Sequence, residues 1–336
     1  MSRLNHTIKL KTVSAHIVFP VLRLIGLLTR RFNYRGLGRA AILLGHVFPP
    51  AMVDVRLSPS TTIQIDLFDD YWLRLIVGSS LYEPEIETFL DKLPPDYYWV
   101  DCGANIGYWS LRLSERLPPG HVVAVEASPD TFKRLVTNNR LSGERFCAIN
   151  KALSECPGEE VLFKTSGGHA SAHIVSTSEA AQDQSTLVNV ETTTVDELIR
   201  SLSPRPEKDL IVVKLDVEGA ECAAIRGAEA SINRFNVIFI YECHGNDLQC
   251  VTTQHVLEDG RFDVYSLEGK ITPVTSVHDA RAIKTDPRKG YNFVAIKKSS
   301  PLKLTEKKGW ADSSHFSMVS SFSCAREGAS RAQERA

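Results

Sequence analysis

The sequence has no excess of either charge, no paired cysteine motif and no internal repeat. Its 336 residues carry a formal net charge of -1, so no strong field favours nucleic acid or an anionic surface. The seven cysteines are odd in number and scattered, and no C-x-x-C pair occurs. This pattern argues against a disulfide framework or a structural zinc site. We therefore expect a cytoplasmic protein that does not bind nucleic acid.

An uninterrupted apolar run of membrane-spanning length is also missing. Residues 13–28 are apolar, but His16, Pro20 and Arg23 interrupt them, and the stretch is short for a membrane span. Two arginines follow where a signal peptide would have a small-residue cleavage site. We expect a helix docked on the protein, with peripheral membrane contact as the alternative.

The chain does contain a regular alternation of short apolar runs and helical patterns from Tyr98 onward. The runs are "YWVDCG", "HVVAVEA", "FCAINKALS", "DLIVVKLDV" and "VIFIYEC". The alternation predicts an α/β fold, with a mostly parallel central sheet and helices on both faces. In such sheets ligands bind beyond the carboxyl ends of the strands.

Composition divides the chain into three predicted parts. Residues 1–70 suggest a helical extension followed by a β-hairpin, and residues 71–299 contain the alternating pattern. Residues 300–336 are rich in Ser, Lys, Glu and Ala, with "GWADSSHFSMVSSF" as their only apolar island. We expect this last part to be a disordered tail.

The stretch "WVDCGANIGYWSL" predicts a strand, a tight turn and a helix. Asp101 ends the strand, and Gly103 and Gly107 enclose Ala104 and Asn105. The dinucleotide fingerprint G-x-G-x-x-G is absent, because Asn105 stands where its second glycine would be. The turn therefore disfavours an NAD(P)-dependent oxidoreductase. Close helix–strand packing alone would also use these glycines.

An acidic residue ends the next predicted strand. Glu126 lies 25 residues after Asp101 and can accept hydrogen bonds from both hydroxyls of a ribose. Together the turn and this carboxylate predict a site for an adenosine without a diphosphate. S-adenosylmethionine fits this description, and nearby carboxylates would favour its sulfonium cation.

A second polar group follows the fourth core strand, in "VVKLDVEGAECAAIRGAE". Lys214, Asp216 and Glu218 cluster where this strand meets a helix. Acidic side chains at a helix N-terminus are also stabilised by the helix dipole, which is the structural alternative. The exit of the strand is nevertheless where a substrate would bind.

With this segment the sequence resembles the FkbM-type methyltransferases. The matching stretches are "YEPE", "VDCGANIGYWS", "VVAVEASPDTFKRLVTNN", "INKALSE", "TTVDEL", "VVKLDVEGAECAAIRGAE" and "FIYECH", within about residues 80–295. The resemblance implies the class I Rossmann-like fold, S-adenosylmethionine as cofactor, and O-methylation of hydroxyl groups on sugars or natural products.

The resemblance also implies roles for individual residues. It assigns cofactor binding to the glycine turn and the acidic residue after it, namely Asp101, Gly103, Ala104, Asn105, Gly107 and Glu126. Asn150 and Ala152, just past the third strand, are expected near the adenine. Glu83 in "YEPE" matches a family position before the turn, and a surface acid at a helix start is the alternative.

The transfer of a methyl group to an alcohol needs a general base. We expect it to be Asp216, Glu218 or His244, with Asp216 preferred and Lys214 orienting Asp216 or the acceptor. These acidic residues could instead bind a divalent metal, but no clear metal-ligand motif occurs, so no metal is expected. The loop 165–174, with Gly167, Gly168, His169 and His173, is a candidate lid on the acceptor side or an ordinary surface loop.

Two other functions remain to be weighed. A nucleic-acid methyltransferase would have an N/D-P-P-Y type of sequence after the fourth strand, where this chain has "LDVEG". A catalytically silent binding protein could retain the same fold. A glycan, a lipid-linked sugar and a small metabolite all stay open as acceptors, and the oligomeric state is not predicted.

Overall fold

The structure is a computed structural model that describes residues 7–32, 34–77, 82–165, 173–174, 187–206, 208–306 and 316–320. The chain forms two compact units. The first comprises Met1–Pro84 and Pro95–Glu242, and the second comprises Glu85–Pro94 and Cys243–Ala336. The N-terminal elements pack within the same unit as the glycine turn. The boundaries at 70 and 299 stay predictions.

Five parallel strands form the centre of the first unit. They are β4 (Tyr98–Cys102), β5 (Val122–Val125), β6 (Cys147–Ile149), β11 (Leu210–Leu215) and β12 (Asn236–His244). Their spatial order is β12-β11-β4-β5-β6, and every neighbouring pair is parallel. The order reverses between β4 and β11, which is the switch point where doubly wound sheets bind ligands. The predicted α/β class is thus confirmed.

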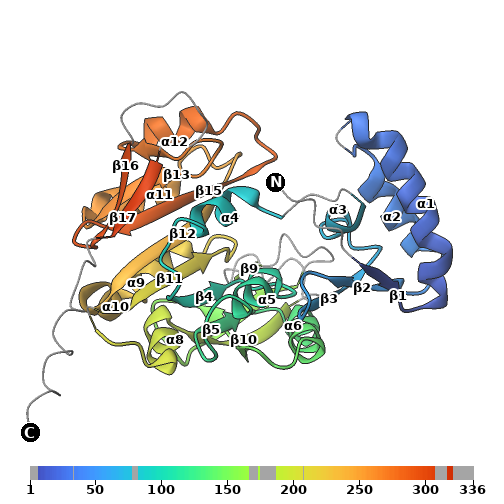
Figure 1. Ribbon diagram of the computed structural model, residues 1–336, viewed down its shortest axis with the longest axis horizontal. Helices are drawn as coiled ribbons and strands as arrows, with labels where there is room; N and C mark the ends of the chain where they lie inside the picture. The colour runs from blue at the N-terminus through green and yellow to red at the C-terminus, as the bar shows by residue number, and fades with distance from the viewer. Residues whose placement is uncertain are drawn as a thin grey trace, which may run out of the picture. The chain divides into compact units, whose positions relative to one another are not determined.

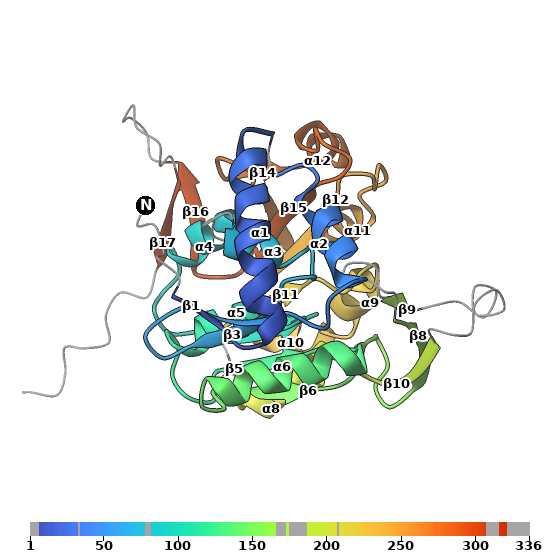
Figure 2. The same cartoon turned by 90° about the vertical axis from the view of Figure 1, so that its right-hand side faces the viewer.

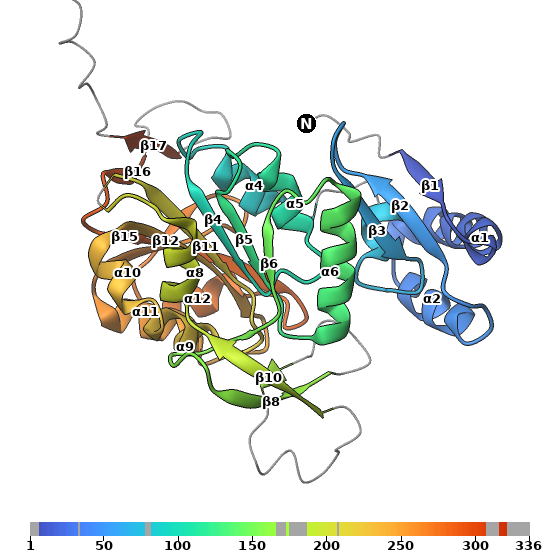
Figure 3. The same ribbon diagram turned by 90° about the horizontal axis from the view of Figure 1, so that it is seen from below.

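Helices cover both faces of these strands. They are α5 (Tyr108–Ser114), α6 (Pro129–Leu141), α8 (Val195–Leu202), α9 (Glu221–Arg226) and α10 (Glu229–Arg234). In Figure 3, α5 and α6 lie on one side of β4 and β5, and α8 lies on the other. The two longer of these helices begin at hydroxyl caps, since Ser128 accepts from the amide of Thr131 and Thr194 from that of Glu197.

An N-terminal layer belongs to the same unit (Figure 1). Its strands β1 (Ile8–Leu10), β2 (Met52–Arg56) and β3 (Thr62–Asp66) form an antiparallel sheet, so the predicted hairpin is present. Its helices are α1 (Val13–Thr29), the 3-10 turn η1 (Arg30–Phe32), α2 (Leu37–Gly45) and α3 (Leu73–Val77). Helix α1 packs against α2, α3 and β2 (Figure 2). By length and composition alone, Val13–Phe32 is also apolar enough to cross a membrane.

A small sheet follows the third core strand. It has the order β7 (Ala152–Leu153), β10 (Leu187–Thr193), β8 (Glu160–Lys164) and β9 (His173–Ile174). Of the candidate lid, His173 belongs to β9, while Gly167, Gly168 and His169 lie outside the described residues. The lid therefore stays a prediction.

The second unit contains the remaining elements. These are most of α4 (Pro84–Leu90), then α11 (Val251–Asp259), β13 (Phe262–Ser266), β14 (Thr272–Val274), α12 (Val277–Ile283), β15 (Gly290–Lys297), β16 (Leu302–Glu306) and β17 (Phe316–Ser320). Strand β13 pairs antiparallel with both β14 and β15. Within the segment expected to be a disordered tail, β16 and β17 pair antiparallel. The apolar island of that tail supplies β17.

Candidate active site

Three neighbouring strands end in acidic residues at the same edge of the sheet. The pairing register aligns Cys102 of β4 with Leu215 of β11, and Leu215 with Tyr241 of β12. Asp216 and Glu242 directly follow these aligned positions, and Asp101 directly precedes Cys102. Segments far apart in the sequence therefore bring carboxyl groups to the switch point.

Asp101 is buried and hydrogen-bonded within the unit. It is 1% exposed, and its Oδ2 accepts a hydrogen bond from Ser110 Oγ of α5 at 2.5 Å. Burial raises the pKa of this carboxyl, and Lys214 and Ser110 oppose that rise. Asp101 thus ties the strand to the helix after the turn, and its direct contact with a cofactor stays a prediction.

Close contacts with neighbouring atoms explain why both of these turn positions are glycine. Gly103 has φ +78°, and a Cβ there would lie 1.8 Å from the backbone oxygen of Asp216. Gly107 has φ +92°, and a Cβ there would lie 2.7 Å from Leu135 Cδ1 of α6. The amides of Gly103 and Ala104 both donate to the carbonyl of Val125 at the end of β5. The turn is therefore shaped by close packing against its neighbours.

Asn105 joins the turn to the acidic residue after β5. Its backbone is left-handed, with φ +51°, a conformation that asparagine tolerates. Its amide donates to Glu126 Oε2 at 2.9 Å, and its side-chain oxygen accepts from the amide of Ile106 at 2.8 Å and from Trp72 Nε1 at 3.2 Å. Spacing alone predicted that Asn105 and Glu126 serve one site, and the structure places them in contact.

Glu126 is a buried carboxylate with two backbone donors. Its Oε1 accepts from the amide of Ser128 at 2.8 Å, in addition to the bond from Asn105. Burial raises its pKa to about 7, the two amides oppose the rise, and Asp216 and Asp101 add to it. A carboxylate has about four acceptor positions, so Glu126 keeps capacity for further donors.

The two residues expected near the adenine have different surroundings. The side-chain amide of Asn150 donates to the carbonyls of Glu126 at 2.7 Å and Ala127 at 3.0 Å, so it fixes the backbone beside the site. Ala152 is 1% exposed and belongs to a core cluster with Phe163 and Val190. Ala152 therefore has a packing role here, and a contact with adenine is not supported by its burial.

Lys214 is a buried cation among the strand-exit carboxylates. Its Nζ lies 2.8 Å from Asp216 Oδ2, and its side chain is 5% exposed. Burial alone would lower the pKa of Lys214, but Asp216, Glu83 and Asp101 raise it well above its usual value. The expected ion pair of Lys214 with Asp216 is thus present.

The turn after β11 contains two more acidic residues. Glu221 accepts from the amides of Gly219 and Val217, so it shapes this turn. Glu218 lies at the tip with φ +48°. Partial burial, Asp216 and Glu221 raise its pKa to about 7.

Glu242 is the titratable residue that the sequence interpretation did not select. It lies near the end of β12, in the "FIYECH" stretch. Burial raises its pKa to about 8, with Asp216 and Glu83 adding to the rise and Lys214 opposing it. Its position after an apolar strand was the available signal, but its proximity to the other carboxylates depends on strand order. Lys214 interacts electrostatically with the carboxyl groups of four residues, which we call the acidic cluster: Glu83, Asp216, Glu218 and Glu242.

Aromatic side chains before the turn were also missed. Trp72 is 2% exposed, and its ring lies 5.0 Å from Tyr82 and 6.0 Å from Tyr108, measured between centroids. Trp109 Nε1 donates to Glu83 Oε2 at 2.7 Å, so the "YEPE" acid is tied to the helix after the turn. This contact favours a role at the site over that of a free surface acid.

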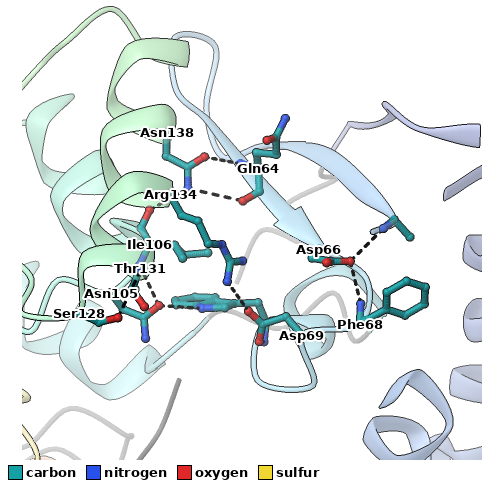
Figure 4. A network of polar contacts seen from close by, with 12 residues as sticks. Gln64, Asp66, Phe68, Asp69, Asn105, Ile106, Ser128, Thr131, Arg134 and Asn138 are labelled. Carbon is teal, nitrogen blue, oxygen red and sulfur yellow. Dashed lines mark hydrogen bonds and ion pairs between the residues drawn. The ribbon is translucent and has the colours of Figure 1, made fainter. Parts of the chain in front are cut away.

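Polar contacts join residues 64–69 to helix α6. Asn138 Oδ1 accepts from the amide of Gln64 at 2.7 Å, and Arg134 Nη1 lies 3.0 Å from Asp69 Oδ2. Figure 4 shows Asn138 and Arg134 pointing from α6 toward these residues, with Asn105 close by. The extension is therefore part of the scaffold of the site.

His244 forms a local hydrogen bond with a neighbouring residue. It belongs to the second unit, where it is exposed and its Nδ1 lies 2.7 Å from Asn246 Oδ1. Its catalytic role stays a prediction. Among the described residues no group of three or more His, Cys, Asp or Glu side chains has the arrangement to hold a metal ion.

Comparison with known proteins identifies this arrangement. Residues 101–262, which contain the glycine turn, Glu126, the acidic residues after β11 and Glu242, match the family described as "Methyltransferase FkbM domain". The chain carries an FkbM-type methyltransferase domain. The strand order and the switch-point site give this domain the class I Rossmann-like fold.

Two relatives of the FkbM-type domain are named as methyltransferases. Over 169 residues the chain is 30% identical to the hexuronic acid methyltransferase AglP of Haloferax volcanii, covering 50% of this chain and 64% of that protein. It is 25% identical over 235 residues to methyltransferase sdnD of Sordaria araneosa, covering 60% of this chain and 88% of that one. An O-methyltransferase from Bacillus cereus solved with SAH has a TM-score of 0.36 and 12% identity, covering 68% of this chain and 90% of that one.

The cofactor of this FkbM-type domain is S-adenosylmethionine. The residues present fit it. Glu126 has acceptor capacity left for ribose hydroxyls, and the acidic cluster with Asp101 provides more negative charge than Lys214 balances. Burial is the largest cause of the raised carboxyl pKa values at Glu126 and Glu242, and Asp216 adds to both. A cation bound beside these groups would be stabilised by their carboxylate forms.

Proposed function

We propose that this chain transfers a methyl group from S-adenosylmethionine to a hydroxyl oxygen of a sugar, glycan or natural product. The observation that carries the proposal is the match of residues 101–262 to the FkbM methyltransferase domain. The carboxyl of Glu242, directly after the aligned residues of β12, supports it, because burial and the neighbouring Asp216 raise its pKa to about 8. A hydroxyl acceptor must lose its proton as the new C–O bond forms. General bases work best when their pKa lies near the working pH.

The residues of the site divide the work in this proposal. S-adenosylmethionine, when bound, supplies the electrophilic methyl group. Glu126 and the Asn105 turn would bind the adenosine, and Glu242 would take the hydroxyl proton. Asp216, preferred from the sequence, is held by Lys214 at 2.8 Å, so we assign it to orientation of the acceptor instead. Holding the acceptor oxygen in line is worth several kcal/mol in such reactions.

The acceptor class draws its support from the relatives. AglP is named as a hexuronic acid methyltransferase, and 30% identity over half of this chain makes sugars the first class to test. A hexuronic acid offers both hydroxyls and a carboxylate. A hydroxyl needs a general base, whereas an ionised carboxylate does not, and only the first would use Glu242.

The experiment has two stages. Calorimetric titration with S-adenosylmethionine, beside NAD and with Glu126→Ala, should show binding of S-adenosylmethionine alone, lost in the variant. Transfer of labelled methyl is then measured to hexoses, hexuronic acids, hydroxylated aliphatic compounds and their amino counterparts. Label in an alkali-stable ether is the expected result. Label in an alkali-labile ester or on nitrogen contradicts the proposal, and binding without transfer to any acceptor favours a catalytically silent protein.

A further inference from the structure

Helix α1 has two apolar faces, and the described residues cover only one of them. Ala15, Val18 and Leu22 are 0–1% exposed where the helix packs on the N-terminal layer. The opposite side is exposed and apolar at helical spacing, and helix α2 continues it. We call this surface the N-terminal apolar face: Val13, Ile17, Val21, Leu24, Leu27, Leu28, Phe32, Ile42, Leu43 and Val47.

The helices that form this face carry charge of one sign only. The first acidic residue of the chain is Asp54, and eight Lys or Arg residues precede it, in a protein with a net charge of -1. Arginines 23, 30, 31, 35 and 39 are exposed, and none forms an ion pair within the described ranges. An apolar surface bordered by unpaired cations is complementary to a layer that is apolar inside and anionic outside.

We propose that the N-terminal apolar face lies on the surface of a lipid bilayer that contains anionic lipids. Exposed apolar side chains such as Leu24 and Leu28 enter the boundary between headgroups and acyl chains, and the arginines contact lipid phosphates. This inference goes beyond the methyl-transfer proposal and does not depend on the identity of the acceptor.

Two alternatives, self-association of this face and a transmembrane helix, fit the observations less well. If the face bound a second copy of itself, the unpaired arginines of the two copies would lie close together, and this repulsion between like charges costs free energy. A transmembrane orientation would require the covered face of α1, at Ala15, Val18 and Leu22, to leave its packing on α2, α3 and β2. It would also place Arg23 within the hydrocarbon.

The test is sedimentation of the full chain with vesicles. Phosphatidylcholine vesicles are compared with vesicles of phosphatidylcholine and phosphatidylglycerol. We expect binding to the mixed vesicles, reduced by added salt because the cations contribute. The double variant Leu24→Asp with Leu28→Asp should abolish it. The matched control, Leu141→Asp with Leu248→Asp, replaces exposed leucines elsewhere and should bind like the unchanged chain.

A second pair of variants tests the charges. Arg30→Gln with Arg31→Gln should weaken binding to the mixed vesicles by about fivefold for each arginine. Arg200→Gln with Lys270→Gln removes two exposed cations outside the N-terminal layer and should leave binding unchanged. All replaced residues are exposed, and circular dichroism confirms that each variant is folded.

Four results would overturn the proposal. One is the absence of binding to mixed vesicles, and another is binding that Leu24→Asp with Leu28→Asp leaves intact. The third is self-association that the same variant disrupts and that vesicles do not compete with, which would make the face an interface between copies. Binding that resists alkaline carbonate would indicate insertion across the bilayer and would equally count against a surface location.

Discussion

The backbone oxygen of Asp216 lies 1.8 Å from the position that a Cβ on Gly103 would occupy. The amide of Asp216 also donates to the carbonyl of Cys102 at 3.0 Å. The glycine turn after β4 and the acidic turn after β11 are thus in backbone contact. The position of the acidic cluster therefore depends on a residue that the sequence suggested for cofactor binding.

This contact predicts a large effect of Gly103→Ala. The added Cβ meets backbone, which cannot move aside cheaply, and φ is +78°. We expect a loss of at least about 2 kcal/mol in the free energy of unfolding, together with weaker binding of S-adenosylmethionine. Urea unfolding and calorimetry measure the two effects.

Gly120→Ala is the control for that experiment. Gly120 has φ +83°, but a Cβ there would meet nothing within 4 Å. This variant should show only the conformational cost of about 1–2 kcal/mol, with cofactor binding unchanged. Equal losses in the two variants would show that the contact with Asp216 contributes nothing.

Some of this site was predictable because strand ends obey simple rules. Parallel strands place their carboxyl ends at one edge, so a ligand site after these strands was expected there, and Asn105 and Glu126 are in contact at that edge. The reason for Gly103 was not predictable, since it depends on the approach of β11. Trp72 and Tyr82 were missed because no periodic pattern links their segment to the turn.

The tail and the domain boundaries show a different limit. Composition cannot show the pairing of β16 with β17, because this pairing depends on strands that only a fold can bring together. The disorder expected after residue 299 stays a prediction. The boundary predicted at residue 70 rests on a change in the sequence pattern at that position. Hydrogen bonds such as Asn138 to Gln64, which join the extension to α6, leave no trace in local composition.

Glu242→Gln should separate catalysis from cofactor binding. The neutral amide cannot take a proton, so kcat for a hydroxyl acceptor should fall by about 10²–10⁴-fold. The affinity for S-adenosylmethionine, measured by calorimetry, should change little. The limb of the pH profile of kcat near pH 8, which reflects the pKa of about 8, should disappear.

Two companion variants make this result specific. Glu159→Gln replaces an exposed glutamate and should keep full activity. Asp216→Asn tests the residue that the sequence favoured as base. If Asp216→Asn removes the limb near pH 8 and Glu242→Gln leaves it, the base is Asp216 and our assignment is wrong.

Glu126 should make the cofactor-free protein less stable as the pH rises. Its pKa is 4.5 ordinarily and about 7 in the folded chain. Below pH 4.5 both states are protonated, but above it the unfolded state releases the proton more readily. The contribution of this group is therefore lost between about pH 4.5 and 7, a change on the order of 3 kcal/mol.

The change is measured as the Tm of the cofactor-free protein across this pH range. Glu126→Gln has no charge to bury, so its Tm should fall less with pH than that of the unchanged chain. Glu159→Gln should follow the unchanged chain. Identical pH dependence of the unchanged chain and Glu126→Gln would show that the folded-state pKa of Glu126 is not raised.

Lys214 should be the most sensitive charged residue of the site. Lys214→Met leaves Asp216 without the cation 2.8 Å from it, and breaking a buried ion pair typically costs about 3–5 kcal/mol. The double variant Lys214→Met with Asp216→Asn should recover part of this loss. Lys151→Met breaks a more exposed pair with Glu191 and should cost about 0–1 kcal/mol.

The same lysine should also tune the proposed base. Lys214 opposes the rise in the pKa of Glu242, so its removal should move the limb of the pH profile of kcat above pH 8. A structural ion pair remote from the reaction would lower the free energy of unfolding, measured in urea, without moving that limb. A limb that stays in place while stability falls would therefore limit Lys214 to a structural role, and a limb that moves would connect it to Glu242.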